Sequence, residues 1–174
     1  ACEYIDRGIP ESKLVVTGIP VSKKFRSRKE KLETRRGLGI GTDGPVVLVM
    51  TGSMGFGNIA DMIEVIEKGL PEDGRIIILG GNNHKLKEKL RREFKGHKMV
   101  QVLDFTTQAD LYMDICDVLV TKPGGLTTTE AAAKGIPLVH SAPIPGCETK
   151  NAAFFSEHGM SAAAQSDREA GERV

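Results

Sequence analysis

Residues 118–140 read VLVTKPGGLTTTEAAAKGIPLVH, and this stretch predicts a strand, a turn, a helix and a second strand in immediate succession. The apolar run Val118–Val120 is typical of a strand buried on both faces. After a turn with two adjacent glycines, three consecutive alanines predict a thin helix that can pack close to a sheet. Gly135 and Pro137 end that helix in the order that helix C-termini favour, and Leu138–His140 begins the next strand.

The same alternation of strand and helix runs through the preceding part of the chain. Further apolar runs predict buried strands at Val46–Met50, Arg75–Leu79 and Met99–Leu103. Apolar residues at helical spacing predict helices between the strands, over 59–66, 86–94 and 111–115. The sequence therefore predicts an α/β fold, a Rossmann-like parallel sheet with helices on both faces, which binds ligands beyond the carboxyl ends of its strands.

Bulk composition excludes several classes of protein. The chain has 174 residues, of which 40% are hydrophobic, enough for the core of one domain. A net charge of +1 gives no global field that would attract nucleic acid, so we expect no nucleic-acid partner. Cys2, Cys116 and Cys147 form no CxxC pair, which indicates reduced thiols and a cytoplasmic protein.

Positive charge is clustered locally, between Lys23 and Arg36 and again between Lys85 and Lys95. One interpretation of each cluster is a solvated helix face. The other is attraction to an anionic surface, either phosphates or acidic lipid headgroups, with peripheral contact at the inner face of the cell membrane. In the opening segment, Leu14–Thr17 could form a strand, and 22–36 reads as a basic helix or linker.

Glycine-rich turns after two of the predicted strands suit a phosphate-bearing ligand. The turn at 51–58 opens a helix, where exposed backbone N–H groups favour anions, although its glycine spacing is neither GxGxxG nor that of a P-loop. In the turn quoted above, Gly124 and Gly125 let a ligand approach the backbone, and Thr127 can donate a hydroxyl or cap the helix. Glu130 can accept hydrogen bonds from a ribose diol. The alternatives are a tight turn without ligand and a capping carboxylate.

Two further loops carry candidate side chains. The rigid loop 142–151 brings Glu148 near a helix start, where it can reach sugar hydroxyls or lie solvated and favoured by the helix dipole. In the loop after the strand Met99–Leu103, Phe105 can stack on a base, with a core Phe as the alternative. The four histidines lack the spacing of metal ligands, so we expect no metal site, and we interpret His140 as a satisfied core or edge residue.

The string KPGGLTTTEAAAKGIPLVHSAPIPGCETKNAAFF, residues 122–155, resembles the C-terminal domain of glycosyltransferase family 28. Lys122 and the PxPGxExxNA pattern are similar to the branch that glycosylates diacylglycerol. The resemblance implies a GT-B fold, in which two Rossmann-like domains face a cleft. It also implies that residues 1–18 are a remnant of the N-terminal domain and interdomain segment. Residues 19–174 would then be the donor-binding domain, with its C-terminal end incomplete.

The resemblance assigns donor-binding roles by position. Glu130 would bind the ribose, the 52–55 turn the diphosphate, Phe105 and the Thr106 backbone the uracil, and Glu148 with Asn151 the donor sugar. The predicted donor-binding residues are Gly52, Ser53, Met54, Gly55, Phe105, Thr106, Lys122, Gly124, Gly125, Leu126, Thr127, Glu130, Glu148 and Asn151. Relatives often place Arg after TGxPV, where this chain has Ser22, so a phosphate contact from that segment is not predicted.

The activity that the resemblance implies is transfer of a hexose from UDP-hexose to a lipid acceptor of the diacylglycerol type, with inversion at the anomeric carbon. No cofactor is expected, and UDP-sugar is the donor substrate. The catalytic residues and the acceptor site would belong to the N-terminal domain, so this chain alone is expected to be inactive. The alternatives are a peptidoglycan N-acetylglucosaminyltransferase, a GT-B-fold UDP-sugar epimerase and a nucleotide-sensing domain without turnover. The glycine pattern disfavours a dehydrogenase.

Overall fold

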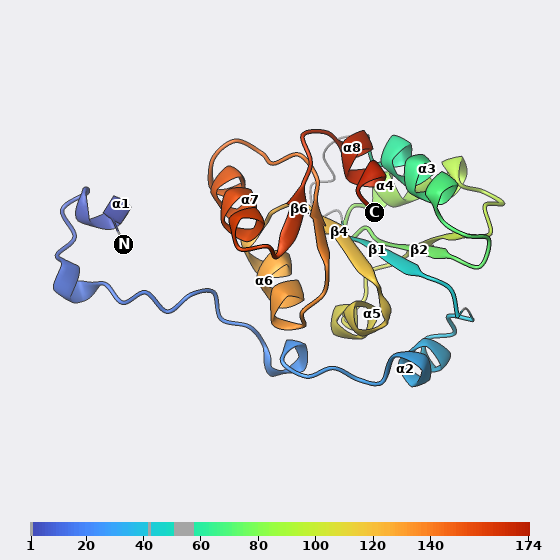
Figure 1. Ribbon diagram of the computed structural model, residues 1–174, viewed down its shortest axis with the longest axis horizontal. Coiled ribbons are helices and arrows are strands. Elements are labelled where there is room, and N and C mark those ends of the chain that lie inside the picture. The colour runs from blue at the N-terminus through green and yellow to red at the C-terminus, as the bar shows by residue number, and fades with distance from the viewer. Residues whose placement is uncertain (1, 42, 51–57) are drawn as a thin grey trace.

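A computed structural model describes residues 2–41, 43–50 and 58–174 of the chain. Its centre is an all-parallel sheet of six strands in the order β3-β2-β1-β4-β5-β6 (Figure 1). The strands are β1 Val46–Met50, β2 Arg75–Leu79, β3 Val100–Leu103, β4 Val118–Thr121, β5 Leu138–His140 and β6 Ser161–Ala163. This order is that of dinucleotide-binding Rossmann sheets, so the predicted fold class is confirmed.

Helices cover both faces of the sheet (Figure 1). The α-helices are α1 Cys2–Ile5, α2 Lys31–Gly37, α3 Ile59–Gly69, α4 His84–Glu93, α5 Ala109–Ile115, α6 Gly125–Ala133, α7 Cys147–Glu157 and α8 Asp167–Glu172. Two short 3-10 helices, η1 Glu11–Lys13 and η2 Lys23–Phe25, lie in the N-terminal segment. Apolar residues of α3, α4 and α8 pack on one face, while those of α5, α6 and α7 pack on the other.

Alternation along the strands explains why both faces can be buried. In β1, Val46 and Leu48 belong to the α5 side, whereas Val47 and Val49 belong to the α3 side. All five predicted strands are confirmed, with shifts of one residue at the start of β3 and the end of β4. Such doubly buried strands read as continuous apolar runs, which is why the sequence reveals them.

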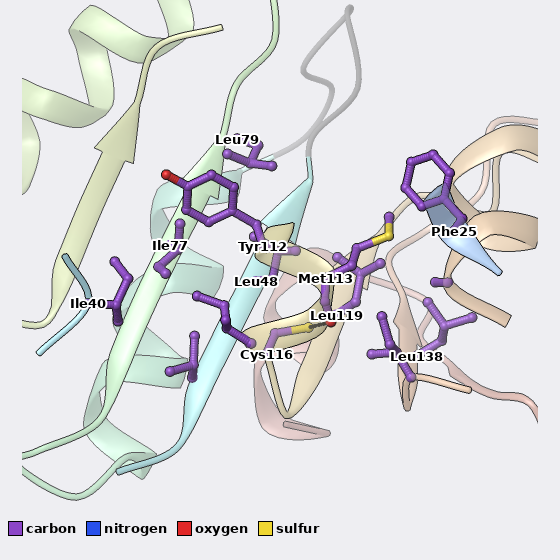
Figure 2. Close-up of a cluster of buried hydrophobic side chains, with 14 of the residues drawn as sticks. Phe25, Ile40, Leu48, Ile77, Leu79, Tyr112, Met113, Cys116, Leu119 and Leu138 are labelled. Carbon is purple, nitrogen blue, oxygen red and sulfur yellow. Dashed lines mark hydrogen bonds between the residues drawn. The ribbon is translucent and has the colours of Figure 1, made fainter. Parts of the chain in front are cut away.

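The core cluster under α5 includes a side chain from the N-terminal segment. Tyr112 and Met113 pack against Leu48 and its neighbours, and Phe25 of η2 joins the same cluster at its far side (Figure 2). The Cys116 thiol lies in this core and donates to the Met113 carbonyl at 3.4 Å, and burial raises its pKa to about 12. Cys116 is therefore a protonated core residue, and η2 is part of the folded domain.

The basic stretch between residues 23 and 36 is largely used inside the fold. Lys134 of the α6 C-cap forms a buried ion pair with Asp114 at 2.5 Å and donates to the Ser27 carbonyl at 2.9 Å. Arg28 donates to the Gly135 carbonyl at 3.0 Å. Arg35 is 4% exposed and donates to the Ile115 and Gly44 carbonyls. These contacts hold the segment against α5 and α6, so the stretch is neither a free linker nor one uniformly solvated face.

Some expectations about the ends of the chain are wrong. Leu14–Thr17 forms no strand, because no strand of the described sheet lies beside it. Residues 2–18 contribute no strand to the sheet, and Glu3 forms an ion pair with Lys150 of α7. The strand β6 and the helix α8 were not predicted, since Ser161–Ala163 is short and has little apolar pattern. Its pairing with β5 stabilises it as a strand. None of the helices in the described ranges has the length and apolar run needed to cross a bilayer.

A buried histidine ends β5. His140 is 0% exposed, its Nε2 lies 3.3 Å from the Thr128 hydroxyl, and its Nδ1 has no hydrogen-bond partner. Its ring meets Phe155 edge-on, with centroids 5.9 Å apart. The expectation of a core residue is confirmed, but the ring is only half satisfied. Burial lowers the pKa of His140 to about 4, so the folded protein holds it neutral.

This burial predicts a loss of stability in acid. Below about pH 6.5 the unfolded chain gains a proton on His140, whereas the folded chain gains it only near pH 4. Stability is therefore lost as pH falls through this window. Between about pH 7.5 and about pH 5, wild type should lose about 2 kcal/mol more unfolding free energy than His140→Gln. Urea unfolding at both pH values measures this, and equal losses in the two proteins would contradict it.

Gly171 of α8 is required by the close approach of α8 to α3. A Cβ there would lie 2.8 Å from the Met62 carbonyl oxygen and 3.0 Å from the Val65 Cβ. Gly171→Ala should therefore lower the unfolding free energy by about 1–3 kcal/mol, the usual cost of overpacking. The matched control is Gly69→Ala, since nothing lies within 4 Å of its added Cβ. Thermal unfolding compares the two variants, and equal midpoints would show that α8 can shift away freely.

Candidate functional site

The register of the sheet brings the carboxyl ends of its strands to one edge. Met50, at the end of β1, pairs with Leu79 and with Thr121, and Leu79 pairs in turn with Leu103. Thr121 also donates through its hydroxyl to the Met50 carbonyl at 2.9 Å. The loops after these strands therefore emerge side by side. The predicted turn at Gly52, Ser53, Met54 and Gly55 lies outside the described residues.

A pocket of about 280 Å³ opens at this edge, between the loops that follow β2 and β3 and the start of α6. It is lined by Met50, Leu79, Gly81, Asn82, Asp104, Phe105, Thr106, Ala109 and Thr127. The structure thus brings three predicted residues, Phe105, Thr106 and Thr127, to one cavity. Sequence reasoning missed Gly81 and Asn82, although the turn GGNN also follows a strand and opens a helix, which is the signal used for the other loops.

Phe105 is a surface residue of the pocket and not a core residue. Its side chain is 62% exposed, so the core interpretation is wrong. The loop around it is held in place: the Thr106 hydroxyl accepts from the Gln108 N–H at 3.0 Å. An exposed aromatic ring on a fixed loop offers a flat apolar surface for a planar ligand.

Glu130 lies on α6, three residues after Thr127 and therefore on the same side of the helix. Its carboxylate is half-buried and has no hydrogen-bond donor in the described part of the chain. Burial raises its pKa, and the charge of Lys24 opposes that shift. The capping interpretation is wrong, because the N-cap of α6 is Gly124 and no side chain caps the helix. Glu130 is thus a carboxylate without a structural role in the helix start.

Lys24 is a residue near this site that the sequence did not single out. Its Nζ donates to the Thr107 carbonyl at 2.9 Å and lies 3.3 Å from an Asp110 carboxylate oxygen. It therefore connects η2 with the start of α5, and its charge reaches Glu130. In the sequence it is one of many lysines in a basic run, and only the fold shows which lysine faces the pocket side of α6.

The two glycines of the predicted turn before α6 differ in how much space surrounds them. A Cβ on Gly124 would meet nothing within 4 Å, so the backbone there is open to a ligand. A Cβ on Gly125 would lie 2.9 Å from Ile19 Cδ1, so the N-terminal segment already approaches that side. Leu126 is 67% exposed, and Lys122 borders a small hollow of about 20 Å³.

Glu148 and Asn151 lie at the same edge of the sheet but do not line the pocket beside Phe105. One carboxylate oxygen of Glu148 accepts from the Ile144 N–H at 2.7 Å and closes its own loop. The Asn151 side chain donates to the Pro123 carbonyl at 2.9 Å and holds the turn before α6. The expectation that Glu148 is simply solvated is wrong. These two residues shape the β5–α7 side of the edge, next to the turn that carries Lys122.

Comparisons with known proteins agree with this geometry. Residues 46–174 match the glycosyltransferase family 28 C-terminal domain. The chain is 34% identical over 173 residues to the processive diacylglycerol beta-glucosyltransferase of Staphylococcus saprophyticus, covering 99% of this chain and 44% of the relative. The chain therefore spans less than half the length of that curated relative.

Solved structures show the same fold at lower identity. MurG of Acinetobacter baumannii superposes with a TM-score of 0.60 at 20% identity, over 89% of this chain and 47% of MurG. HepE of Anabaena, solved in complex with UDP-glucose, superposes with a TM-score of 0.64 at 17% identity, over 99% of this chain and 50% of HepE. Together with the match over residues 46–174, these findings show that the chain belongs to the glycosyltransferase family 28 C-terminal domain family.

Proposed function

We propose that this chain is the donor-binding part of an inverting hexosyltransferase that transfers a hexose from a UDP-sugar to a lipid acceptor of the diacylglycerol type. The observation that carries the proposal is an exposed ring, Phe105, in a pocket at the carboxyl edge of a Rossmann sheet. Glu130, about one turn along α6 from the pocket residue Thr127, has a half-buried carboxylate with no hydrogen-bond donor in the described ranges. The name of the staphylococcal relative supports the choice of acceptor and of a hexose donor.

In this proposal the base lies in the pocket beside Phe105, and the ribose lies next to it, toward α6. Uracil stacks beside Phe105, where the Thr106 backbone can hydrogen-bond its edge. The ribose then lies toward α6, and its two adjacent hydroxyls donate to the Glu130 carboxylate. A half-buried carboxylate with no donor in the described ranges gains free energy when hydroxyls supply hydrogen bonds to it. This is the reason for placing the ribose there.

The diphosphate lies where helix N-termini converge. Stabilising its negative charge is the chemical contribution of the chain. Negative charge grows on UDP as the bond to the sugar breaks, and backbone N–H groups aimed at the phosphates stabilise that charge. The open backbone at Gly124 admits such a group. The turn at 52–55 is assigned to the same role by its sequence alone. With these dipoles in place, transfer requires no metal ion.

The hexose extends toward the β5–α7 side of the edge. Glu148 uses one carboxylate oxygen for the Ile144 N–H, and Asn151 uses its amide nitrogen for the Pro123 carbonyl. Neither the second Glu148 oxygen nor the Asn151 carbonyl oxygen has a partner in the described ranges. Both are acceptors, which suits the hydroxyl groups of a sugar. Hydrogen bonds already made by each side chain fix its orientation.

We also propose contact with an anionic membrane. Fewer basic residues are available for it than the run between Lys23 and Arg36 contains. Lys24, Arg28, Lys31 and Arg35 all bind groups within the domain. The other cations of that run, Lys23, Arg26, Lys29 and Arg36, are exposed. Each well-placed cation contributes about 1 kcal/mol to binding at an acidic surface. A cytoplasmic enzyme with such a surface would reach the lipid acceptor at the inner face of the cell membrane.

A transfer assay with the full-length protein tests the activity. UDP-glucose and diacylglycerol should give a glycolipid with inverted anomeric configuration, in EDTA as well as in Mg²⁺. UDP-N-acetylglucosamine with a lipid-linked muramyl acceptor should give far less product. Thin-layer chromatography of the lipids and NMR of the anomeric proton measure the outcome.

Each alternative gives a different result in the same assay. A muramyl product would identify the peptidoglycan transferase, and free epimerised UDP-sugar would identify an epimerase. Binding of UDP-sugar without any turnover would indicate a sensing domain. Strict dependence on Mg²⁺ would contradict the proposed role of the helix N-termini in stabilising the leaving group.

Glu130→Gln should weaken UDP binding to the 174-residue chain by about 10- to 100-fold, the loss expected when hydrogen bonds to a charged group are weakened. Isothermal titration calorimetry measures the dissociation constant. The matched control is Glu157→Gln, an exposed glutamate at the end of α7. The analogue 2′,3′-dideoxy-UDP lacks the two ribose hydroxyls and should bind wild type and Glu130→Gln with equal affinity. Unchanged UDP affinity in Glu130→Gln would remove this residue from the site.

A further inference from the structure

Lys87 of α4 is a lysine buried beside the pocket and outside its lining. Its side chain is 2% exposed, although lysine is among the residues least often buried. A buried ammonium group needs a partner, and the partner here is Asp104, whose carboxylate oxygen lies 3.3 Å from Lys87 Nζ. Asp104 is the first residue of the loop that carries Phe105.

The stem of Lys87 also contacts the second loop of the pocket. A Cβ on Gly80 would lie 2.6 Å from Lys87 Cγ, so the lysine passes directly against the backbone that leads to Gly81 and Asn82. Asn83 starts α4 by accepting from the Leu86 N–H at 3.0 Å, and its carbonyl accepts from the Lys87 N–H at 3.1 Å. One side chain therefore spans from the β2–α4 loop to the β3–α5 loop.

A second cation completes the contact at Asp104. Arg91, one turn further along α4, lies 3.0 Å from the same Asp104 oxygen and also donates to the Val102 carbonyl at 3.3 Å. Hydrogen bonds from Arg91 and Lys87 hold the pKa of Asp104 below its usual value, so the contact stays ionised at neutral pH. The carboxylate is 75% exposed, and its ion-pair partners within the described residues are the two cations of α4.

The loop that carries Phe105 is thus restrained along its whole length. Asp104 is bound to α4, the Thr106 hydroxyl to the Gln108 N–H, and the Thr107 carbonyl to Lys24. Phe105 lies between these restraints, and its ring is exposed. A ring on a preformed loop binds a base with less loss of conformational entropy than a ring on a mobile loop.

We propose that Lys87 is a positioning residue that fixes the two pocket loops, and Phe105 with them, in the arrangement that takes the nucleotide base. This inference rests on the proposed function, because it assumes that the pocket binds uridine nucleotides. Lys87 has no contact with the ligand in this proposal. Its effect passes through the ion pair with Asp104 and through its packing against Gly80.

Lys87→Met tests the proposal, since methionine keeps most of the stem and removes the ammonium group. The affinities of the 174-residue chain for UDP and for ADP, which shares the ribose and the diphosphate, are measured by calorimetry and by competition. The variant should bind UDP about tenfold more weakly, within the usual coupling of residues in one network, while ADP affinity changes less than about twofold. Lys89→Met, an exposed lysine on the same helix, is the matched control.

Asp104→Asn tests the same ion pair from its exposed partner. This side chain can be replaced without unfolding the domain, because it is 75% exposed. The double variant Lys87→Met/Asp104→Asn should bind UDP no more weakly than Asp104→Asn alone, since Asp104→Asn already removes the contact with Lys87 together with that of Arg91. Additive losses would overturn the inference. Equal weakening of UDP and ADP in Lys87→Met would also overturn it, by showing a general loss of structure. If wild type does not bind UDP, the proposed function fails instead.

Discussion

Hydrogen bonding between parallel strands fixes where each loop of this domain leaves the sheet. Because Met50, Leu79 and Leu103 are in register across β1, β2 and β3, the loops that follow them start at the same height. The strands can hold this register only because both of their faces are buried, as the two clusters on either side of the sheet show. The pocket beside Phe105 is a consequence of that alignment, and no single loop would form it alone.

Buried cations hold the parts of the domain that the sheet does not reach. Lys134 joins α6 to α5 and to the segment at Ser27, and Arg35 joins α2 to the end of α5. Lys87 does the same for two loops at the opposite edge. Each of these side chains crosses apolar surroundings with its stem and places its charge on a carboxylate or on backbone carbonyls. These buried cations therefore add nothing to the basic surface that the exposed lysines and arginines form.

Two kinds of residue lie at the carboxyl edge of the sheet. Some shape the site through contacts within the protein, and others are available to a ligand. Asn151 binds the Pro123 carbonyl, and Thr128 is buried against His140, so both support the turn around α6. In contrast, no protein group within the described ranges binds the exposed ring of Phe105 or the carboxylate of Glu130. Such groups can accept contacts from a ligand without breaking contacts within the protein. We propose that this contrast distinguishes the binding residues from their neighbours better than residue type does.

The sequence by itself determined β1 to β5 of the sheet, the helices between them and the glycine-rich loops for which we propose a function. Continuous apolar runs and glycine turns are local signals, and the string 122–155 is specific enough to indicate the family. Tertiary structure alone decided which charged residues are free. Glu148 closes its own loop, Lys87 is buried, and β6 forms only because β5 offers it hydrogen bonds. The burial of Lys87 and the formation of β6 depend on groups brought together from separate parts of the chain, and residue spacing does not record that proximity. Glu148 accepts from an N–H four residues away, and that contact depends on a loop conformation that the sequence does not show.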